Sequence, residues 1–283
     1  MKTTGAAENN MRHLHLHNYK IEAKGIKKKI IYQFSDVHLT EYDHLSDEKE
    51  KESAISFTQI WIKQRLVFAD NHGDPYNKEE LQTARAYFAE LLAAANEGDV
   101  LVMAGDICHD LSGANLRALD ADMKNLQIPY MYVLGNHESI DDIPDGHLLE
   151  KAKAPVQILE LEDMLIFGLD NSLQTVTREQ NETLRNALLG EKPLLIVMHS
   201  PITTEGNKAD IERYGGHFRF NYEGAPEEVL EFVEILKQNA SKVLAVLAGH
   251  LHFASDSEIA PGLMQYVSSQ GVLGHINRFE IGD

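Results

Sequence analysis

The sequence predicts an α/β protein in which short buried strands alternate with longer helices. Five apolar runs rich in Ile, Val, Leu and Met recur along the chain, at 30–34, 100–104, 130–134, 194–198 and 243–248. Most of them are preceded by a longer stretch with helical spacing, namely 45–68, 78–96, 114–126, 178–189 and 225–239. Apolar runs without polar alternation are typical of strands buried on both faces, as in the centre of an α/β sheet.

Further segments extend this pattern to two sheets and one domain. Additional strand-like segments lie at 156–159, 164–168, 264–268 and 276–281, which favours two sheets over one. The long connection 40–98 is expected to hold two helices, separated by a turn at 70–75. No Pro-, Gly- or Ser-rich linker interrupts the chain, so we expect a flexible tail over 1–10 and a single domain over 11–283.

Composition and charge exclude several classes of partner. The 283 residues carry a formal net charge of −18, which disfavours nucleic-acid polymers and anionic membranes. A single cysteine, Cys108, rules out an intrachain disulfide framework. No apolar stretch reaches the ~18 residues of a membrane span. We therefore expect a cytoplasmic protein acting on a small molecule, with its oligomeric state left open.

Each of the five apolar runs ends in side chains that bind metals. The runs are followed by "SDVH", "GDICHD", "GNHE", "HSP" and "GHLH", which contribute Asp36, His38, Asp106, Asn136, His137, His199, His250 and His252. Because sites in α/β sheets form beyond the carboxyl ends of the strands, these side chains are expected to meet in one crevice. Glycine comes directly before Asp106, Asn136 and His250, where it permits a sharp turn and a close approach of the backbone.

The residue types indicate the chemistry of this crevice. Imidazole, carboxylate and amide groups together suit Zn, Mn, Fe, Co or Ni rather than Ca or Mg. The set is larger than one ion with an open coordination position requires, so it predicts two ions that share a bridging carboxylate. Two ions ~3.5–4 Å apart stabilise the attacking and leaving oxygens of an in-line displacement. The predicted reaction is hydrolysis of a phosphate ester.

The motifs "DVH", "GDICHD", "GNHE", "MHSP" and "GHLH", in this order, resemble those of the calcineurin-like metallophosphoesterases over roughly residues 29–283. The resemblance implies two mixed β-sheets packed as a sandwich with helices on the outer faces (α/β/β/α). It implies that one ion is held by Asp36, His38, Asp106 and His252, and the second by Asp106, Asn136, His199 and His250. It also implies catalytic roles for Asp106, Asn136 and His137: His137 would protonate the leaving oxygen or hold the phosphoryl group, and the nucleophile would be a hydroxide that bridges the metals.

The substrate class stays open at this level. We favour a phosphodiesterase of small molecules, because no large domain follows "GHLH" and no basic patch suggests a nuclease. A phosphomonoesterase or a pyrophosphohydrolase with the same two-metal site is the alternative. A non-catalytic scaffold on this fold is a further alternative, but such proteins usually have a broken ligand set.

The remaining chemistry-bearing residues receive plainer interpretations. "HLHLH" at 13–17 alternates with period two and is interpreted as a half-exposed edge strand rather than a metal site. His44, His72, His147 and His275 are expected to be loop or surface residues. Cys108 is expected to fill a small buried space, and Asp110 to make structural hydrogen bonds.

One loop is a candidate substrate wall. The segment 207–224 places cationic and aromatic side chains around a glycine pair, namely Arg213, Tyr214, His217, Arg219 and Tyr222. Such side chains can hold a phosphate and a base or sugar. The hypothesis is that this loop contacts the substrate.

Overall fold

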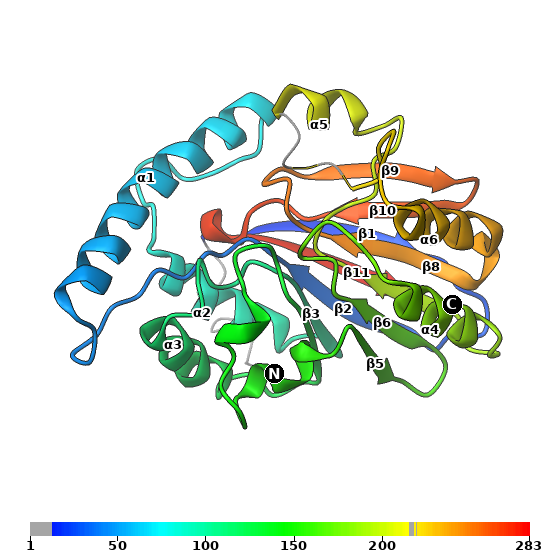
Figure 1. The fold of residues 1–283 in the computed structure, drawn as a ribbon, viewed down its shortest axis with the longest axis horizontal. Coiled ribbons are helices and arrows are strands. Elements are labelled where there is room, and N and C mark those ends of the chain that lie inside the picture. Colours follow the sequence, from blue (N-terminus) through cyan, green and yellow to red (C-terminus); the bar gives the residue numbers. More distant parts are fainter. Residues whose placement is uncertain (1–12, 215–217, 219) are drawn as a thin grey trace, which may run out of the picture.

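Two mixed β-sheets form the centre of the protein in the computed structural model, which describes residues 13–214, 218 and 220–283 (Figure 1). The 5-stranded sheet has the order β1 (His15–Ile21), β11 (His275–Ile281), β2 (Lys29–Phe34), β3 (Val100–Ala104) and β4 (Tyr130–Val133). The 6-stranded sheet has the order β5 (Val156–Glu160), β6 (Leu165–Leu169), β7 (Leu194–Val197), β8 (Val243–Ala248), β10 (Leu263–Val267) and β9 (Ser255–Ala260).

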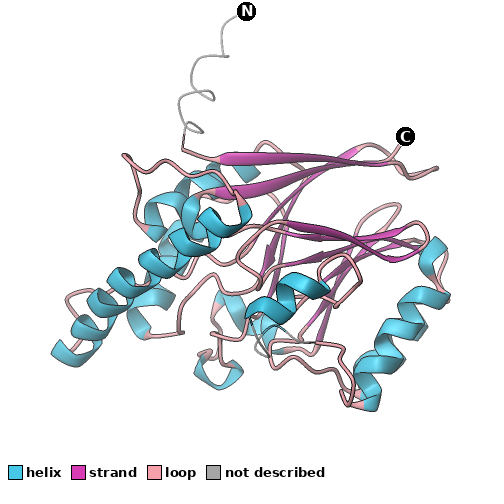
Figure 2. Ribbon diagram, turned by 90° about the horizontal axis from the view of Figure 1, so that it is seen from above, coloured by secondary structure: helices cyan, strands magenta, loops and turns pink. Residues whose placement is uncertain are grey.

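Helices cover the outer faces of both sheets (Figure 2). On these faces lie α2 (Ala84–Ala95), α3 (Gly113–Met123), α4 (Arg178–Leu188) and α6 (Glu227–Gln238). Helices α1 (Glu48–His72) and α5 (Lys208–Tyr214) instead arch beside the two sheets (Figure 1). Short 3-10 helices lie at η1 (Ile140–Asp142), η2 (Leu148–Lys153), η4 (Ala240–Lys242) and η5 (Gly271–Leu273). No helix in the part of the chain that the structure describes has both the length and the apolarity of a bilayer span.

Three large apolar cores fill the spaces between these layers in the part of the chain that the structure describes. The facing sides of the two sheets share one core, in which Val102 and Met131 of the first sheet pack with Leu195 of the second. Helices α2 and α3 pack on the outer face of the first sheet. Helices α4 and α6 pack on the outer face of the second, for example through Leu184 and Phe232. The predicted α/β/β/α sandwich is confirmed.

Most elements lie where the apolar pattern predicts them, and two were missed. Strand β9 was missed because its sequence, "SDSEIA", is largely polar, as an exposed edge of a sheet permits. Helix α5 lies inside the segment 207–224, which was interpreted as a loop. The tail expected over 1–10 lies outside the described residues, and the single domain over 11–283 stays a prediction.

Local capping signals fix the ends of the long helix α1. Asp47 accepts a hydrogen bond from the backbone N–H of Glu50, and the Glu50 side chain accepts one from the backbone N–H of Asp47. Gly73 ends the helix with a left-handed φ of 70°, a conformation that glycine adopts without steric cost. This end agrees with the turn predicted at 70–75, although the helix continues to His72 rather than stopping at residue 68.

The histidine-rich start of the chain forms an edge strand, as predicted. Strand β1 is the outermost strand of its sheet, and its residues alternate between half-buried and exposed. Its partner strand β11 shows that the interpretation of His275 was wrong. His275 is completely buried; its Nε2 donates to Pro75 O (2.9 Å) and its Nδ1 accepts from His17 Nε2 (2.9 Å).

Two of the other histidines also differ from their simple interpretation. His72 is the last residue of α1 rather than a loop residue, and its ring stacks on Phe253 with the centroids 3.7 Å apart. His147 is half-buried and caps η2 through a hydrogen bond from the N–H of Leu149. His44 is exposed in a turn, as predicted.

The buried His275 predicts a specific loss of stability in acid. Burial, and then the nearby rings of His15 and His17, lower the pKa of His275 to about 3. In the unfolded chain, His275 takes up a proton near pH 6.5, whereas in the folded protein it stays neutral down to about pH 3. The free energy of unfolding is therefore unaffected by this group above pH 6.5 and decreases as the pH falls from 6.5 toward 3. Between pH 7.5 and 5.0, His275→Asn should lose about 2 kcal/mol less unfolding free energy than the wild type, as measured by urea denaturation. The exposed control His44→Asn should follow the wild type, and equal losses in all three proteins would contradict the assignment.

Candidate metal centre

The predicted ligands lie in two groups at the carboxyl ends of the strands. The first group contains Asp36, His38, Asp106 and His252, and the second contains Asp106, His199 and His250. Within each group, one donor atom per residue lies within 4.8 Å of the others. Asp106 belongs to both groups, as a bridging carboxylate would.

Unusual backbone conformations mark the same place. The non-glycine residues with positive φ in the described part of the chain are Asp36, His38, Asp106, Gln174, His250 and His252. Such conformations cost roughly 1–3 kcal/mol each and gather where a site requires them. Five of these residues are predicted ligands, and the sixth, Gln174, has its Nε2 3.2 Å from His250 Nε2.

Backbone contacts between the loops hold this arrangement. The N–H of Asp36 donates to Gly105 O and the N–H of His38 donates to Asp106 O, both at 3.0 Å. A Cβ at Gly135 would overlap the carboxylate of Asp106, and one at Gly249 would overlap Ser35. The glycines before the ligands therefore permit the close backbone approach that the sequence predicted.

The donor atoms in these groups are suited to a transition-metal ion. Asp36 Oδ1 lies 3.0 Å from His252 Nε2, and Asp106 Oδ2 lies 3.2 Å from His199 Nε2. Both oxygens are buried, and neither accepts a well-directed hydrogen bond from a described residue. The Nδ1 of His199 donates to Ala104 O at 2.8 Å, which turns Nε2 toward the centre in the way metal-binding imidazoles are usually held. The residues present thus fit the metal pair that their types predict.

The pKa values show a concentration of negative charge. Burial alone would lower the pKa of His199, but the carboxylates of Asp106 and Asp36 raise it to about 9. Burial alone would raise the pKa of Asp106, but the surrounding imidazoles, above all His199, hold it well below its usual range. The centre therefore requires positive charge, which either protons or bound cations can supply.

Glu138, the last residue of "GNHE", organises the loop that carries Asp106. Its Oε2 accepts hydrogen bonds from the N–H groups of Asp106 (3.1 Å) and Gly135 (2.9 Å). Its Oε1 accepts from the N–H of Cys108 (2.8 Å) and the hydroxyl of Tyr132 (2.5 Å). Cys108 is fully buried beside it, as predicted, and burial raises the pKa of its thiol.

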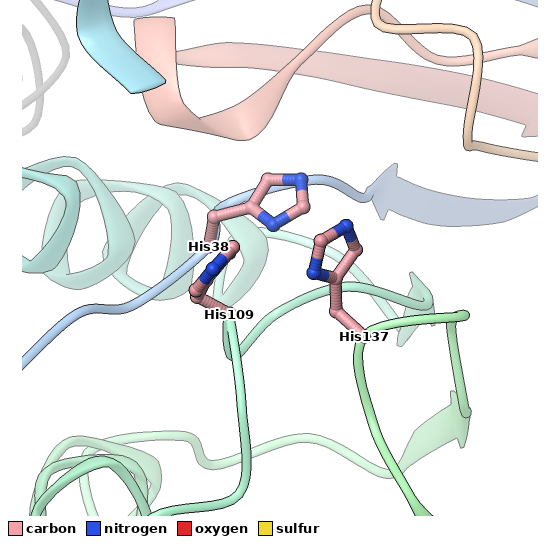
Figure 3. Close-up of side chains that lie close together, drawn as sticks. All are labelled: His38, His109 and His137. Atoms are coloured by element: carbon pink, nitrogen blue, oxygen red, sulfur yellow. The ribbon is translucent and has the colours of Figure 1, made fainter. Parts of the chain in front are cut away.

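Three histidines from different loops meet beside the first group (Figure 3). His137 lies with its ring centroid 4.9 Å from that of His38 and 4.7 Å from that of His109. The N–H of His137 donates to Asp106 Oδ1 at 2.9 Å, which fixes its position relative to the metal ligands. His38, His109 and His137 also satisfy the geometry of a cation-binding group. No role was predicted for His109; its only sequence signal is its place in "GDICHD".

Helix α1 contributes residues to the site that sequence reasoning missed. Arg65 is 1% exposed, and its Nη2 donates to His38 Nε2 at 2.9 Å while its Nη1 contacts His252 Nδ1. Its guanidinium lies 4.0 Å from the ring centroid of Trp61, which in turn stacks on His38. Burial lowers the pKa of Arg65 to about 9, against the opposing effect of the carboxylates, so it remains a cation at neutral pH. Helical spacing placed these residues on one helix face but could not show what that face covers.

A cavity of about 520 Å³ opens over the centre. One side is formed by predicted ligands and their neighbours, including Asp106, Asn136 and His137. The other side is aromatic: α1 contributes Trp61 and Phe68, the end of α5 contributes Tyr214, and Phe218 follows that helix. The cavity can therefore hold a polar group against the centre and an apolar group against its wall.

The candidate substrate loop reaches this cavity in part. Tyr214 lines it, whereas Tyr222 lines a separate hollow beside β9, and Arg213 is exposed and pairs with Asp210. His217 and Arg219 lie outside the described residues.

Asp110 has the structural role expected of it. Its Oδ1 accepts hydrogen bonds from the N–H of Ser112 and from Asn115 Nδ2, both at 3.0 Å. It belongs to neither metal group.

Solved structures that align with this chain include two phosphatases and a 5'-nucleotidase. A dimetal phosphatase from Danio rerio aligns with a TM-score of 0.55 and 12% identity over 86% of this chain and 88% of that chain. A purple acid phosphatase from yellow lupin aligns at 0.47 and 13% over 90% and 45%, and a 5'-nucleotidase from Candida albicans at 0.42 and 12% over 91% and 47%. The alignment with the Danio rerio protein shows that the two chains share a fold.

Sequence comparison gives a more direct result. No curated protein matches the chain. The family model for calcineurin-like phosphoesterases, however, matches residues 30–254, a span that runs from the strand before Asp36 to just beyond His252. The chain therefore belongs to the calcineurin-like phosphoesterase family and is a hydrolase that acts on phosphoric ester bonds.

Proposed function

We propose that the protein hydrolyses a small-molecule phosphate ester, a diester in preference to a monoester, at a centre of two metal ions. The observation that carries the proposal is the pair of ligand groups joined by Asp106 beneath a cavity. One ion is assigned to Asp36, His38, Asp106 and His252, and the other to Asp106, Asn136, His199 and His250. Bound ions would lower the pKa of a water molecule and neutralise charge on the phosphoryl oxygens.

The chain's own residues place the substrate and move the proton. The Oδ1 of Asn136 lies 3.1 Å from His199 Nε2, and Asn136 lines the cavity, so its amide can also touch a phosphoryl oxygen. His137 lines the same cavity and is fixed through its backbone to Asp106. We assign to the His137 imidazole the donation of a proton to the departing oxygen.

The preference for a diester is supported by the shape of the wall. The aromatic side chains offer an apolar surface to a second ester group, which a monoester lacks. A phosphomonoesterase or pyrophosphohydrolase acting through the same residues is the alternative. The net charge of −18 supports a small substrate over a nucleic-acid polymer, and a cytoplasmic location stays a prediction.

The test compares two esters on one protein. Metal-stripped protein, resupplied in turn with Mn, Fe, Zn, Ni, Co or Mg, is assayed with bis-p-nitrophenyl phosphate and p-nitrophenyl phosphate. The proposal expects a transition metal to restore turnover and the bis-ester to be the better substrate. Preference for the mono-ester would overturn the diester assignment but keep the metal centre. No turnover of either ester with any metal would oppose the metal centre itself.

Replacement of His137 by alanine separates proton donation from metal binding. If His137 acts only as the acid, His137→Ala should lower kcat by about 10²–10⁴-fold and leave Zn²⁺ affinity unchanged in calorimetric titration. The loss should be smaller for substrates whose leaving group has a low pKa, because those need less protonation. A parallel fall in Zn²⁺ affinity would instead place His137 among the ligands, with His38 and His109. The exposed His44→Ala serves as the control.

A further inference from the structure

Arg65 is a buried arginine that lines the cavity beside the first ligand group. It is the only lysine or arginine among the described residues that line the cavity. Two of its terminal nitrogens contact His38 and His252, and its Nε has no hydrogen-bond partner among the described residues. A guanidinium has five N–H donors and no acceptor, so this buried group is incompletely satisfied where it lies.

The contacts of Arg65 are incompatible with metal binding by the same histidines. His38 Nε2 lies 3.4 Å from His252 Nε2, and both face the carboxylates of the first ligand group. An Nε2 that binds a cation has no lone pair left to accept from Arg65. A His252 that binds through Nε2 carries its proton on Nδ1, which then cannot accept from Arg65 either. Metal binding by this pair through their Nε2 atoms therefore requires the guanidinium to leave.

The backbone around Arg65 is held in place, so the side chain must make this movement. Gln270 Nε2 donates to Arg65 O at 3.0 Å, and the neighbouring Ala69 is buried against Val272 and Leu273. The same 3-10 segment is tied to the first ligand loop, because the N–H of Val272 donates to Asp36 O at 3.1 Å. The helix thus keeps its register with the metal centre while the Arg65 side chain turns.

The cavity is the space into which the guanidinium can turn, and phosphate is the ligand that its fork fits. Arg65 and Trp61 both line the cavity, and the indole face gives the guanidinium a surface to stack on. A planar guanidinium binds two phosphate oxygens at once, whereas a lysine offers only a point charge.

We propose that Arg65 binds the phosphoryl oxygens of the substrate when the metal groups are filled, and takes the place of a cation between His38 and His252 when they are not. The inference rests on the proposed function and deepens it. It makes α1 part of the substrate site, and it makes Arg65 a competitor of the metal at the first ligand group.

The experiment measures two affinities in the full-length protein. Zn²⁺ is titrated by calorimetry into metal-free wild type and into Arg65→Met, and inorganic phosphate is then titrated into each Zn²⁺-loaded protein. Arg65→Met should bind Zn²⁺ at least as tightly as the wild type and phosphate at least tenfold more weakly, and Arg65→Lys should lie between them for phosphate. Lys63→Met, which removes an exposed charge from the same helix, should match the wild type in both titrations.

Tryptophan fluorescence gives an independent readout. The chain has a single tryptophan, Trp61, and Arg65 lies over its ring. Adding phosphate to the Zn²⁺-loaded wild type should change the Trp61 emission, and the same addition should leave the emission of Zn²⁺-loaded Arg65→Met unchanged.

The outcomes are distinguishable from one another. Equal phosphate affinity in wild type and Arg65→Met would overturn the inference while leaving the metal centre intact. A tenfold loss of Zn²⁺ affinity in Arg65→Met would also overturn it, because Arg65 would then support the ligands rather than compete with the metal. If Arg65→Met fails to fold, Arg65→Lys and Arg65→Gln decide by the same two affinities. A wild type that binds no Zn²⁺ would instead contradict the proposed function.

Discussion

Replacing Asp106 with asparagine should lower kcat by about 10³-fold or more, the largest effect expected of any single change in this protein. Asp106 is the one residue common to both ligand groups, and it is 1% exposed. The amide removes the negative charge that would balance both cations and one of the two oxygens that would hold them. The loss should appear in kcat on the better p-nitrophenyl ester and, by elemental analysis, as a fall in bound metal per chain.

Asp110→Asn is the matched control, because it makes the same chemical change four residues away in the same motif. Asp110 is exposed and bonded to Ser112 and Asn115, outside both ligand groups. Its variant should keep its metal content and most of its kcat. An Asp106→Asn protein that kept its full metal content and a tenth of its activity would exclude the bridging role.

The sequence predicts those parts of the site that depend on short stretches of neighbouring residues. Strands buried on both faces require continuous apolar runs, so their ends can be located from the order of apolar residues along the sequence. Parallel strands present those ends on one side, which is why Asp36, Asp106 and His250 could be expected to meet before any contact was known. The glycines before Asn136 and His250 likewise predicted a close approach of the backbone. The structure agrees, because a Cβ at Gly135 or Gly249 would collide with the neighbouring loop.

The parts that sequence missed depend on how distant elements are packed. The helical pattern of 45–68 shows which residues share a helix face but not what that face packs against. No feature of the neighbouring sequence therefore distinguishes Arg65 from an ordinary helical arginine. His275 is one imidazole at the start of a strand, and only its pairing with β1 and its bond to Pro75 O show that it is buried. Strand β9 is the last strand of its sheet among the described residues, and its polar sequence lacks the apolar signal that identified the other strands.

Glu138→Ala should have the largest effect on stability, lowering the free energy of unfolding by about 3–5 kcal/mol. The carboxylate is 3% exposed and accepts hydrogen bonds from three backbone N–H groups and the hydroxyl of Tyr132. Alanine would leave those donors buried without an acceptor and would release the loop that aims Asp106. Urea unfolding of the metal-free protein measures the first effect. Zn²⁺ titration measures the second, expected as a 10–100-fold weaker affinity, about the usual effect of a change behind a metal ligand.

Glu138→Gln shows whether the acceptor geometry or the negative charge of Glu138 carries this effect. Its amide oxygen can replace Oε2 and keep the bonds from the N–H groups of Asp106 and Gly135, while the Tyr132 hydroxyl can rotate to accept from the amide nitrogen. Only the bond from the Cys108 N–H is then lost, so the cost should be about 1–2 kcal/mol. Glu182→Ala, at an exposed helical position, should cost almost nothing. Equal losses for the glutamine and alanine variants would show that the charge of Glu138, rather than its geometry as an acceptor, holds the loop.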